Sequence, residues 1–506
     1  MANHLFFPLL VPLFSAVLAT LVGQRRVIAR SLALAAVLFD LGYSIWLLFA
    51  VGAAGRLVTQ ADDFAAPFGI SLVADGLSAI MLTLTSIMML VTVLYSFSTV
   101  SPYRERYYYY PLLLLLLFGC GGAFLTGDLF NLYVWFEVLL VASFGLMTLG
   151  GERGQLEGGL KYVVLNLMGS TSFLIGAGLL YGVAGTLNMA HLAERLGSLQ
   201  QPGIVTAVAG FFLFAYSSKA GLVPVFFWLP TSYHTPTLAV SALFSGLLTK
   251  VGIYALYRVF GTVFQRELER YGTLILVIAA LTMVIGVMGA MAQVNVRRIL
   301  SFHIISQVGY MIMGLGLVGV AGLAAGILYM VHHIVVKTAL FMIGGTAEYL
   351  AGTGELKQMG GMARREPILA GLWLLASFSL AGLPPLSGFF GKLGLIQVGL
   401  NQGQWLMVGV AAAVSLFTLF SMLKIWNEVF WKQAYAEQPA TPRASALLIA
   451  PSALLVALSI AIGFGASPVL QYSRYAAEQV FNTQSLVQDI CGPAGCDAVT
   501  STANGQ

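Results

Sequence analysis

The chain has 506 residues, of which 58% are hydrophobic and 9% are charged, and its formal net charge is +5. A soluble globular protein carries about 25% charged residues, so this composition argues against a soluble multidomain enzyme. The positive charge does not indicate nucleic-acid binding, because the basic residues are scattered through short loops. Repeated apolar stretches of about 20 residues predict an all-α polytopic membrane protein that lies in a lipid bilayer.

The apolar spans number fourteen when taken in chain order. The start of the chain lacks the basic region of a signal peptide, so we expect the first helix to be retained. Boundaries obtained in this way are accurate to about 2–4 residues. The spans cover residues 5–22, 31–51, 73–97, 109–125, 128–149, 160–184, from 204 with an interruption at 220–224, 237–260, 273–292, 299–320, 323–350, from 368 with an interruption at 381–385, 405–431 and 447–464. After them we expect no lateral extension helix, only a polar tail.

Two of the spans are interrupted by similar motifs. Ala220–Pro224 reads AGLVP and Ala381–Pro385 reads AGLPP, and the two lie 161 residues and five helices apart. An odd helix offset predicts two inverted five-helix repeats with broken helices 7 and 12. Such breaks mark ion sites in transporters, although packing kinks remain an alternative. The predicted units are helices 1–3 over 1–108, a first repeat over 109–260, an inverted second repeat over 272–431, helix 14 over 446–466 and an external polar tail over 467–506.

The distribution of lysine and arginine predicts the orientation of the chain. With the N-terminus outside, fourteen of these residues fall in cytoplasmic loops, six fall outside, Arg258 among them, and five lie within spans. An even number of spans places the C-terminal tail outside as well. In an oxidising periplasm Cys491 and Cys496 could form a disulfide, and two unpaired cysteines are equally compatible with the sequence. Cys120 lies in an apolar helix and is expected to pack in the core.

Glu137 lies in the middle of a span that reads GDLFNLYVWFEVLLVASF. A charge at bilayer depth costs about 3 kcal/mol or more, so it indicates a functional site by default. Four lysines also lie deep within spans, namely Lys219, Lys250, Lys337 and Lys392. The structural alternatives are a permanently protonated carboxyl bonded to a neighbouring helix and an ion pair with one lysine. One acid cannot pair with four lysines, so some of them need another explanation.

All five basic residues within spans are lysines, the fifth being Lys424. A buried lysine can lose its proton, whereas an arginine effectively cannot. The choice of lysine therefore favours titration over a fixed positive charge. We interpret Lys424 separately, as the partner of Glu428 four residues later in a local helical salt bridge.

Histidines accompany the lysine of the eleventh span. His333 lies four residues before Lys337 on the same helical face, and His332 is its neighbour. Histidine titrates near neutral pH, so we expect this pair to relay protons, with core packing as the alternative. Adjacent helical residues do not converge on one ion, so a metal site is not indicated, and the sequence predicts no cofactor. His303 begins the tenth span, and Asp40 in the second has no assigned role.

Buried charges at moderate separation influence one another. Two unit charges about 10 Å apart at an effective dielectric of about 20 interact by about 1.7 kcal/mol. A proton that moves at one site therefore changes the occupancy of the next site about tenfold. A row of these residues is predicted to translocate protons and to couple them to another ion.

The motif around Glu137 resembles a known family. TGDLFNLYVWFEVLLVASFGLM is similar to the fifth helix of the D subunits of Mrp-type multisubunit sodium/proton antiporters, and VPVFFWLPTSYHTPTLAVSALFSGLLTKVGIYALYR is similar to their seventh and eighth helices. RRILSFHIISQVGYM, HHIVVKTALFMIGG and AGLPPLSGFFGKLGLI are similar to segments of the wider proton-pumping family that includes the antiporter-like subunits of respiratory complex I. The short turn WLPTSYHTP favours the Mrp group, because complex I subunits have a longer turn there. The resemblance covers about residues 1–466.

The resemblance implies roles for the five deep charges. Glu137 matches the family's fifth-helix glutamate, and the lysines match those of the broken seventh helix, the eighth helix, the HHxxxK helix and the second break. In the family they form a hydrophilic axis with two half-channels. The resemblance also implies a hetero-oligomeric membrane complex in the bacterial inner membrane, which exchanges cytoplasmic Na⁺ for external H⁺ using the proton-motive force. No motif identifies the Na⁺ site.

Two rival functions remain open on the sequence. The first is a proton-pumping subunit of complex I or of a membrane-bound hydrogenase, whose redox chemistry would lie in partner subunits because this chain carries no cluster or nucleotide motif. The second is a structural membrane anchor. In either case we expect a subunit that is not itself an enzyme.

Overall fold

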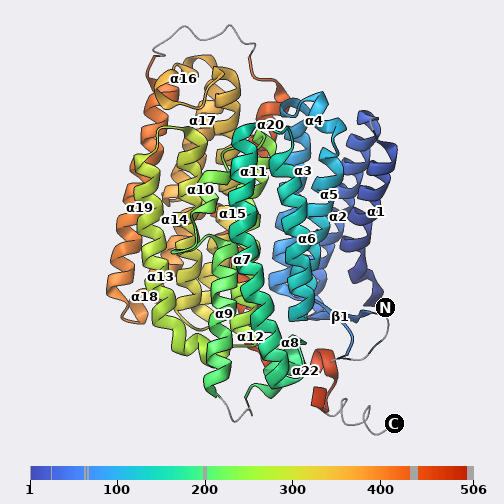
Figure 1. Cartoon of the computed structure of the whole chain (residues 1–506). Helices are drawn as coiled ribbons and strands as arrows, with labels where there is room; N and C mark the ends of the chain where they lie inside the picture. The colour runs from blue at the N-terminus through green and yellow to red at the C-terminus, as the bar shows by residue number, and fades with distance from the viewer. Residues whose placement is uncertain are drawn as a thin grey trace.

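The computed structural model describes residues 2–23, 25–61, 64, 66, 68–197, 202–433 and 443–497, which form a bundle of helices with roughly parallel axes (Figure 1). The last part of the predicted tail, residues 498–506, lies outside the described residues. The first elements in chain order are η1 (Ala2–Phe6), α1 (Phe7–Val22), α2 (Arg26–Ala54), β1 (Leu57–Gln60), β2 (Ser71–Ala74), α3 (Gly76–Thr99), α4 (Pro102–Arg106) and α5 (Tyr109–Leu125).

The middle of the chain contains the first helix break. Its elements are α6 (Leu129–Thr148), α7 (Arg153–Ala184), α8 (Met189–Arg195), α9 (Pro202–Ala220), α10 (Trp228–Ser232), α11 (Leu238–Gly246) and α12 (Leu248–Thr262). Aspartates cap the N-termini of two helices. Asp75 accepts from Ser78 N at the start of α3, and Asp128 accepts from Asn131 N at the start of α6. Capping of this kind satisfies backbone N–H groups that have no partner inside the helix.

The remaining chain contains the second break and two helices beyond the last span. Its elements are α13 (Gln265–Ala292), α14 (Val296–Gly316), α15 (Val320–Ala351), η3 (Leu356–Gln358), α16 (Met362–Arg365), α17 (Pro367–Ala381), α18 (Ser387–Asn401), α19 (Trp405–Ile425), η4 (Trp426–Trp431), α20 (Ala446–Phe464), α21 (Ala466–Phe481) and α22 (Thr483–Cys491).

The predicted spans are confirmed by helices at all fourteen positions. Within the described residues, twelve are long and apolar enough to cross a membrane, and α5 and α17 are shorter apolar helices. The predicted eighth span is not one continuous helix, because the chain breaks at Leu247 between α11 and α12. This break exposes backbone carbonyls in the middle of the bundle.

The centre of the bundle is occupied by α15. Every residue in the most apolar 18-residue stretch of α15 is buried. In the corresponding stretches of α14 and of the α11–α12 span, 94% of the residues are buried. In α1, α2 and α19 only a third of the stretch is buried, which leaves their apolar side chains to face lipid. Charged residues on α12 and α15 are therefore enclosed by protein.

Both predicted helix breaks are present. Helix α9 ends before Gly221 and α17 ends before Gly382, and these glycines have φ values of 75° and 91°. That region of backbone space favours glycine because it has no Cβ atom. Each break also contains a cis proline peptide, Val223–Pro224 in the first and Pro384–Pro385 in the second.

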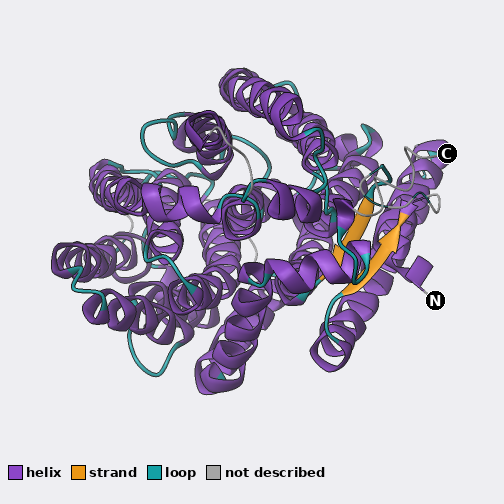
Figure 2. Ribbon diagram, turned by 90° about the horizontal axis from the view of Figure 1, so that it is seen from below, coloured by secondary structure: helices purple, strands orange, loops and turns teal. Residues whose placement is uncertain are grey.

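One end of the bundle, which we call the hairpin face, carries β1, β2, α8 and α22. The two strands pair antiparallel with Leu57 opposite Ala74, and Figure 2 shows them at the edge of the bundle seen from this end. The segment predicted only as a polar tail forms α21 and α22, and α22 lies beside α8 (Figure 1). Cys491 and Cys496 form a disulfide, which decides between the two alternatives left open by the sequence.

Candidate functional site

Glu137 lies on α6 next to Phe136 and is partly buried. Its Oε1 atom is inaccessible to solvent and has no hydrogen-bond partner among the described residues. This oxygen is therefore not bonded to a neighbouring helix, as the structural alternative required. A buried carboxylate oxygen without a donor is expensive unless a proton or a cation accompanies it.

Lys219 lies on the last turn of α9, immediately before the first break. Its Nζ atom is 5.5 Å from the centre of the Phe136 ring, and it interacts electrostatically with Glu137. No ion pair within 4 Å joins Lys219 to Glu137 in the described part of the chain. The two groups are thus near neighbours without direct contact.

A small cavity lies beside Lys219. Its volume is about 20 Å³, enough for roughly one water molecule. Its walls include the amide of Asn166 and the rings of Tyr162 and Trp228. Trp228 on α10 donates to the Ser218 carbonyl at 3.0 Å and so holds the broken segment against α9.

Lys250 lies on the first turn of α12 and is fully buried. The break at Leu247 leaves the carbonyl of Ser245 free to accept, and Lys250 Nζ donates to it at 2.5 Å. The partner of this lysine is therefore a backbone oxygen exposed by the helix break. The alternative of a structural pair with Glu137 does not apply to it.

Lys337 and His333 lie one turn apart on α15, and both are fully buried. Within the described residues, neither Lys337 Nζ nor either ring nitrogen of His333 has a hydrogen-bond partner. Lys250 interacts electrostatically with both groups. Simultaneous charges on these groups would repel one another, so protonation of one disfavours protonation of the others.

His332 faces a different part of the bundle from His333. Its Nδ1 atom lies 2.7 Å from Ser387 Oγ, and Ser387 Oγ lies 2.8 Å from Ser459 Oγ and 3.1 Å from Ser379 Oγ. These hydroxyls come from α18, α20 and α17, around the second break. The two adjacent histidines therefore contact different groups, as expected for neighbouring positions on a helix.

Lys392 lies on α18, just after the second break, and is 4% exposed. Its Nζ atom donates to the carbonyl of Ala381 at 3.0 Å and lies 4.8 Å from the centre of the Tyr310 ring. Ala381 is the last residue of α17, so its carbonyl has no helical partner. Lys250 and Lys392 thus share one arrangement, an amine held by a carbonyl at a helix break.

Several further polar side chains near these groups connect neighbouring helices. Tyr329 on α15 donates to Gln307 on α14. His303 Nε2 lies 2.9 Å from Ser421 Oγ of α19. Serine and threonine are common in apolar helices and bond their own carbonyls, so sequence alone does not single out those that connect helices.

Two predicted assignments of charged residues are wrong. Lys424 donates to the carbonyls of Met291 and Gln293 at 3.0 and 2.6 Å, whereas Glu428 pairs with Lys432. The helix of Lys424 packs against the end of α13, where free carbonyls are closer than the carboxylate.

The other correction concerns Arg258, which is predicted to lie outside the spans. It lies in α12, is 5% exposed and forms an ion pair with Asp75, with one hydrogen bond of 2.7 Å. The pair joins α12 to the start of α3 at the hairpin face.

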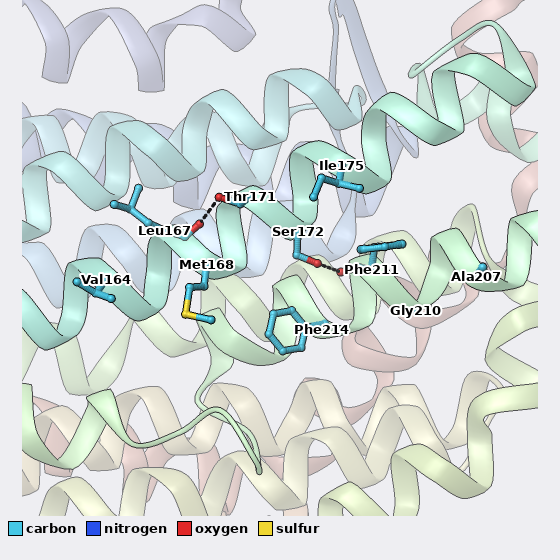
Figure 3. A pocket seen from close by; sticks show the side chains of 10 residues that line it. All are labelled: Val164, Leu167, Met168, Thr171, Ser172, Ile175, Ala207, Gly210, Phe211 and Phe214. Atoms are coloured by element: carbon cyan, nitrogen blue, oxygen red, sulfur yellow. Dashed lines mark hydrogen bonds between the residues drawn. The ribbon is translucent and has the colours of Figure 1, made fainter.

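A wide groove among the described residues is not part of this arrangement. It has a volume of about 760 Å³ and lies between α7 and α9 (Figure 3). Thr171 and Ser172 supply the hydroxyls in its wall, and they donate to the carbonyls of Leu167 and Phe211. The residues that line it include no ionisable side chain.

Comparisons with known proteins identify the family of this chain. Over residues 126–418 the chain matches the family model described as NADH:quinone oxidoreductase/Mrp antiporter, transmembrane. The D subunit of the Na⁺/H⁺ antiporter of Alkalihalophilus pseudofirmus is 45% identical over 97% of this chain and 99% of that protein. The D subunit of the Na⁺/H⁺ antiporter of Bacillus subtilis is 38% identical over 97% and 99%.

Solved structures show the same fold. A chain of the Mrp complex from Dietzia sp. superposes with a TM-score of 0.90 and 34% identity, covering 97% of this chain and all of that one. A chain of an archaeal membrane-bound sulfane sulfur reductase gives 0.87 and 26%, covering 97% and 99%. Respiratory complex I from Thermus thermophilus gives 0.81 and 22%, covering 94% and 99%, and shares the fold alone.

Proposed function

Because the chain belongs to the NADH:quinone oxidoreductase/Mrp antiporter transmembrane family, we propose that it is the ion-translocating D-type subunit of a multisubunit sodium/proton antiporter. It works with other membrane subunits in the bacterial inner membrane and exchanges cytoplasmic Na⁺ for external H⁺. The subunit is a transporter component and not a catalytic enzyme. Both termini face the outside in this proposal, which is supported by the bias of lysine and arginine among the loops.

The observation that carries the proposal is the set of ionisable groups within the bundle. Lys219 lies at the first break, with the half-buried Glu137 of α6 nearby. Lys250, His333 and Lys337 lie around the centre of α15, the last two groups, His332 and Lys392, lie at the second break, and these five are buried. Neutral serine hydroxyls and backbone carbonyls fill the positions between some of them. Groups that were needed only to join helices would be expected to pair with one another, and these do not.

The proposed mechanism uses the coupling between neighbouring charges. A proton that reaches Glu137 removes its attraction for the ammonium of Lys219, so Lys219 gives up its proton more readily. Lys250, His333 and Lys337 repel one another when charged, so a proton arriving at one drives a proton off the next. His332 and its serine partners extend the path to Lys392. The two breaks then lie at corresponding positions of two inverted repeats, residues 109–260 and 272–431.

The alternative is a proton-pumping subunit of a redox-driven complex. Its support is the shared fold of the sulfane sulfur reductase and complex I chains. It is the less favoured proposal, because the relatives with 45% and 38% identity over nearly the whole chain are antiporter subunits.

The test is sodium-dependent proton movement in inverted membrane vesicles that contain the whole complex. Glu137→Gln removes the titratable group and keeps its size, so we expect exchange to fall more than tenfold. Glu152→Gln is the matched control, because Glu152 is exposed and pairs with Arg104 at the surface. Full exchange in Glu137→Gln at equal complex abundance would contradict the proposed role.

A further inference from the structure

Asp40 is a buried acid that the path described above does not use. It lies in the middle of α2 and is 1% exposed, whereas its neighbours Leu38 and Phe39 face lipid. Its Oδ2 atom accepts from Ser86 Oγ on α3 at 2.7 Å. Its Oδ1 atom is buried and has no hydrogen-bond partner within the described residues.

Further oxygen atoms lie around the Ser86 hydroxyl that bonds this carboxyl. Ser44, one turn after Asp40, has its Oγ atom 3.4 Å from Ser86 Oγ and 3.1 Å from the carbonyl of Leu41. Thr83 Oγ1 lies 3.1 Å from the carbonyl of Ser44. Two facing helices thus bring a carboxylate, three hydroxyls and two carbonyls into one small region.

In the described part of the chain, no fixed positive charge balances the carboxyl. Among the described residues no basic side chain forms an ion pair with Asp40, and Arg26 and Arg30 of the same helix both pair with Glu105. The titratable groups that face it are Tyr43 on its own helix and Cys120 on α5. Both are neutral acids in their ordinary state, so neither can compensate an ionised carboxylate.

An uncompensated carboxylate in an apolar interior costs far more than one hydrogen bond returns. The carboxyl must therefore hold either a proton or a cation. A site with one carboxylate and neutral oxygens balances a single positive charge. Hard oxygen ligands suit alkali and alkaline-earth ions, and every side-chain hydrogen bond of Asp40, Ser44 and Ser86 in the described structure joins oxygen to oxygen.

We propose that Asp40, Ser44 and Ser86 form a binding site for one monovalent cation of the sodium type, which competes with a proton for the same carboxyl. In the proton form, the Asp40 carboxyl is neutral. When Na⁺ enters, the O–H bond of the carboxyl breaks, the proton leaves to water, and the carboxylate and serine oxygens bind the cation. Charge in the site is conserved, because one positive charge replaces another.

The site lies apart from the row of lysines, on the α2–α3 side of the bundle (Figure 1). On the same helix, the hydroxyl of Tyr43 lies 3.0 Å from Nδ1 of His4 in η1. The inference deepens the proposed function, since it places a sodium site in a subunit proposed to exchange sodium. Binding at Asp40 can nevertheless be measured without transport.

The first experiment is infrared difference spectroscopy of the purified complex, perfused alternately with NaCl and choline chloride at constant pH. We use the Glu137→Gln complex as the background, so that Glu137 cannot contribute. Sodium is expected to remove the band of one protonated carboxyl and to produce carboxylate bands. When Asp40→Asn is added to this background, the sodium-induced difference should disappear. The proposal would be overturned if the difference persisted in Asp40→Asn. It would also be overturned if the Glu137→Gln complex alone showed no difference.

The second experiment covers the case in which Asp40→Asn prevents assembly. Ser86→Ala removes one oxygen ligand and a small volume, so about tenfold more Na⁺ should be needed for half of the infrared change. Thr85→Val is the matched control, because Thr85 is buried on the same helix and bonds only the Met81 carbonyl. Equal sodium dependence in Ser86→Ala and Thr85→Val would reject the site. The two tests can be told apart in the Glu137→Gln complex. Its sodium/proton exchange tests the proposed function, whereas its infrared signal from Asp40 tests the cation site.

Discussion

At the scale of single residues, the buried lysines differ in how their charge is supported. Lys250 and Lys392 each donate to a carbonyl at a helix break, at 2.5 and 3.0 Å. Lys337 has no such acceptor in the described structure and lies 5.8 Å from the centre of the Phe341 ring. Of the three ammonium groups, that of Lys337 has the fewest acceptors to stabilise its charge. Substitution of Lys337 is therefore the most sensitive test of whether these lysines titrate.

We predict that Lys337→Arg loses exchange almost as completely as Lys337→Ala, by more than tenfold. Arginine keeps the positive charge but does not release its proton, so it cannot take part in transfer. The measurement is sodium-dependent proton movement in vesicles with equal amounts of assembled complex. Lys432→Arg is the control, because Lys432 pairs with Glu428 near the surface. The complex with this substitution should exchange sodium for protons normally. Retention of exchange in Lys337→Arg would mean that a fixed charge is sufficient there.

At the scale of elements, the two helix breaks hold lysines in place. Gly382 has a φ of 91°, and a Cβ atom added there would lie 2.9 Å from Lys392 Cδ. Gly361, before α16, has a φ of 69°, and an added Cβ would meet nothing within 4 Å. Replacing either glycine with alanine therefore introduces similar backbone strain. Only the replacement of Gly382 also displaces a lysine side chain.

We predict that Gly382→Ala and Gly361→Ala each lower stability by about 1–2 kcal/mol, because a left-handed backbone is strained for any residue with a Cβ. Exchange should fall about tenfold or more in Gly382→Ala, because Lys392 must move away from the Ala381 carbonyl. Gly361→Ala should exchange like the unmodified complex. Thermal unfolding and vesicle exchange, measured on both variants, check this prediction, and equal exchange in both would show that the position of Lys392 does not matter.

At the scale of the whole molecule, the C-terminal segment closes the hairpin face of the bundle. Tyr472 and Tyr475 on α21 donate to the carbonyls of Leu48 and Val51 on α2. Beyond α22 and the disulfide, Asp497 accepts from Arg195 at 2.7 Å and lies 2.9 Å from Nε2 of His191. Residues that are hundreds of positions apart thus hold the end of the chain against α8.

We predict that acid loosens this contact. Hydrogen bonds from His191 and Arg195 lower the pKa of Asp497 below its ordinary value. An acid whose pKa is depressed on folding contributes stability above its unfolded pKa and loses it as pH falls through the folded pKa. Hydrogen exchange of residues 483–497, corrected for its intrinsic pH dependence, should stay slow at neutral pH and accelerate below about pH 4. In Asp497→Asn, fast hydrogen exchange of these residues should already be present at neutral pH. An unchanged pH profile of hydrogen exchange would show that the contacts of Asp497 do not hold the C-terminal segment in place.

Much of the architecture was readable from the sequence because hydropathy and helix breaking are local. Apolar length alone predicts the fourteen spans, and the Gly-Pro motifs at residues 220–224 and 381–385 predict both breaks. The deep charges were also predictable, since Glu137 and the four lysines stand out against an apolar background. Their roles in transport stay predictions.

The partners of those residues were decided only by the tertiary structure. Lys250 bonds a carbonyl freed by a break within the eighth span, Lys424 bonds α13 and not its neighbour Glu428, and Asp40 meets Ser86 across 46 positions of sequence. Hydrophobicity determines which segments enter the membrane, but it is the same for every face of an apolar helix. Which oxygen a buried amine or acid meets depends on how the helices pack, and that is a property of the folded bundle.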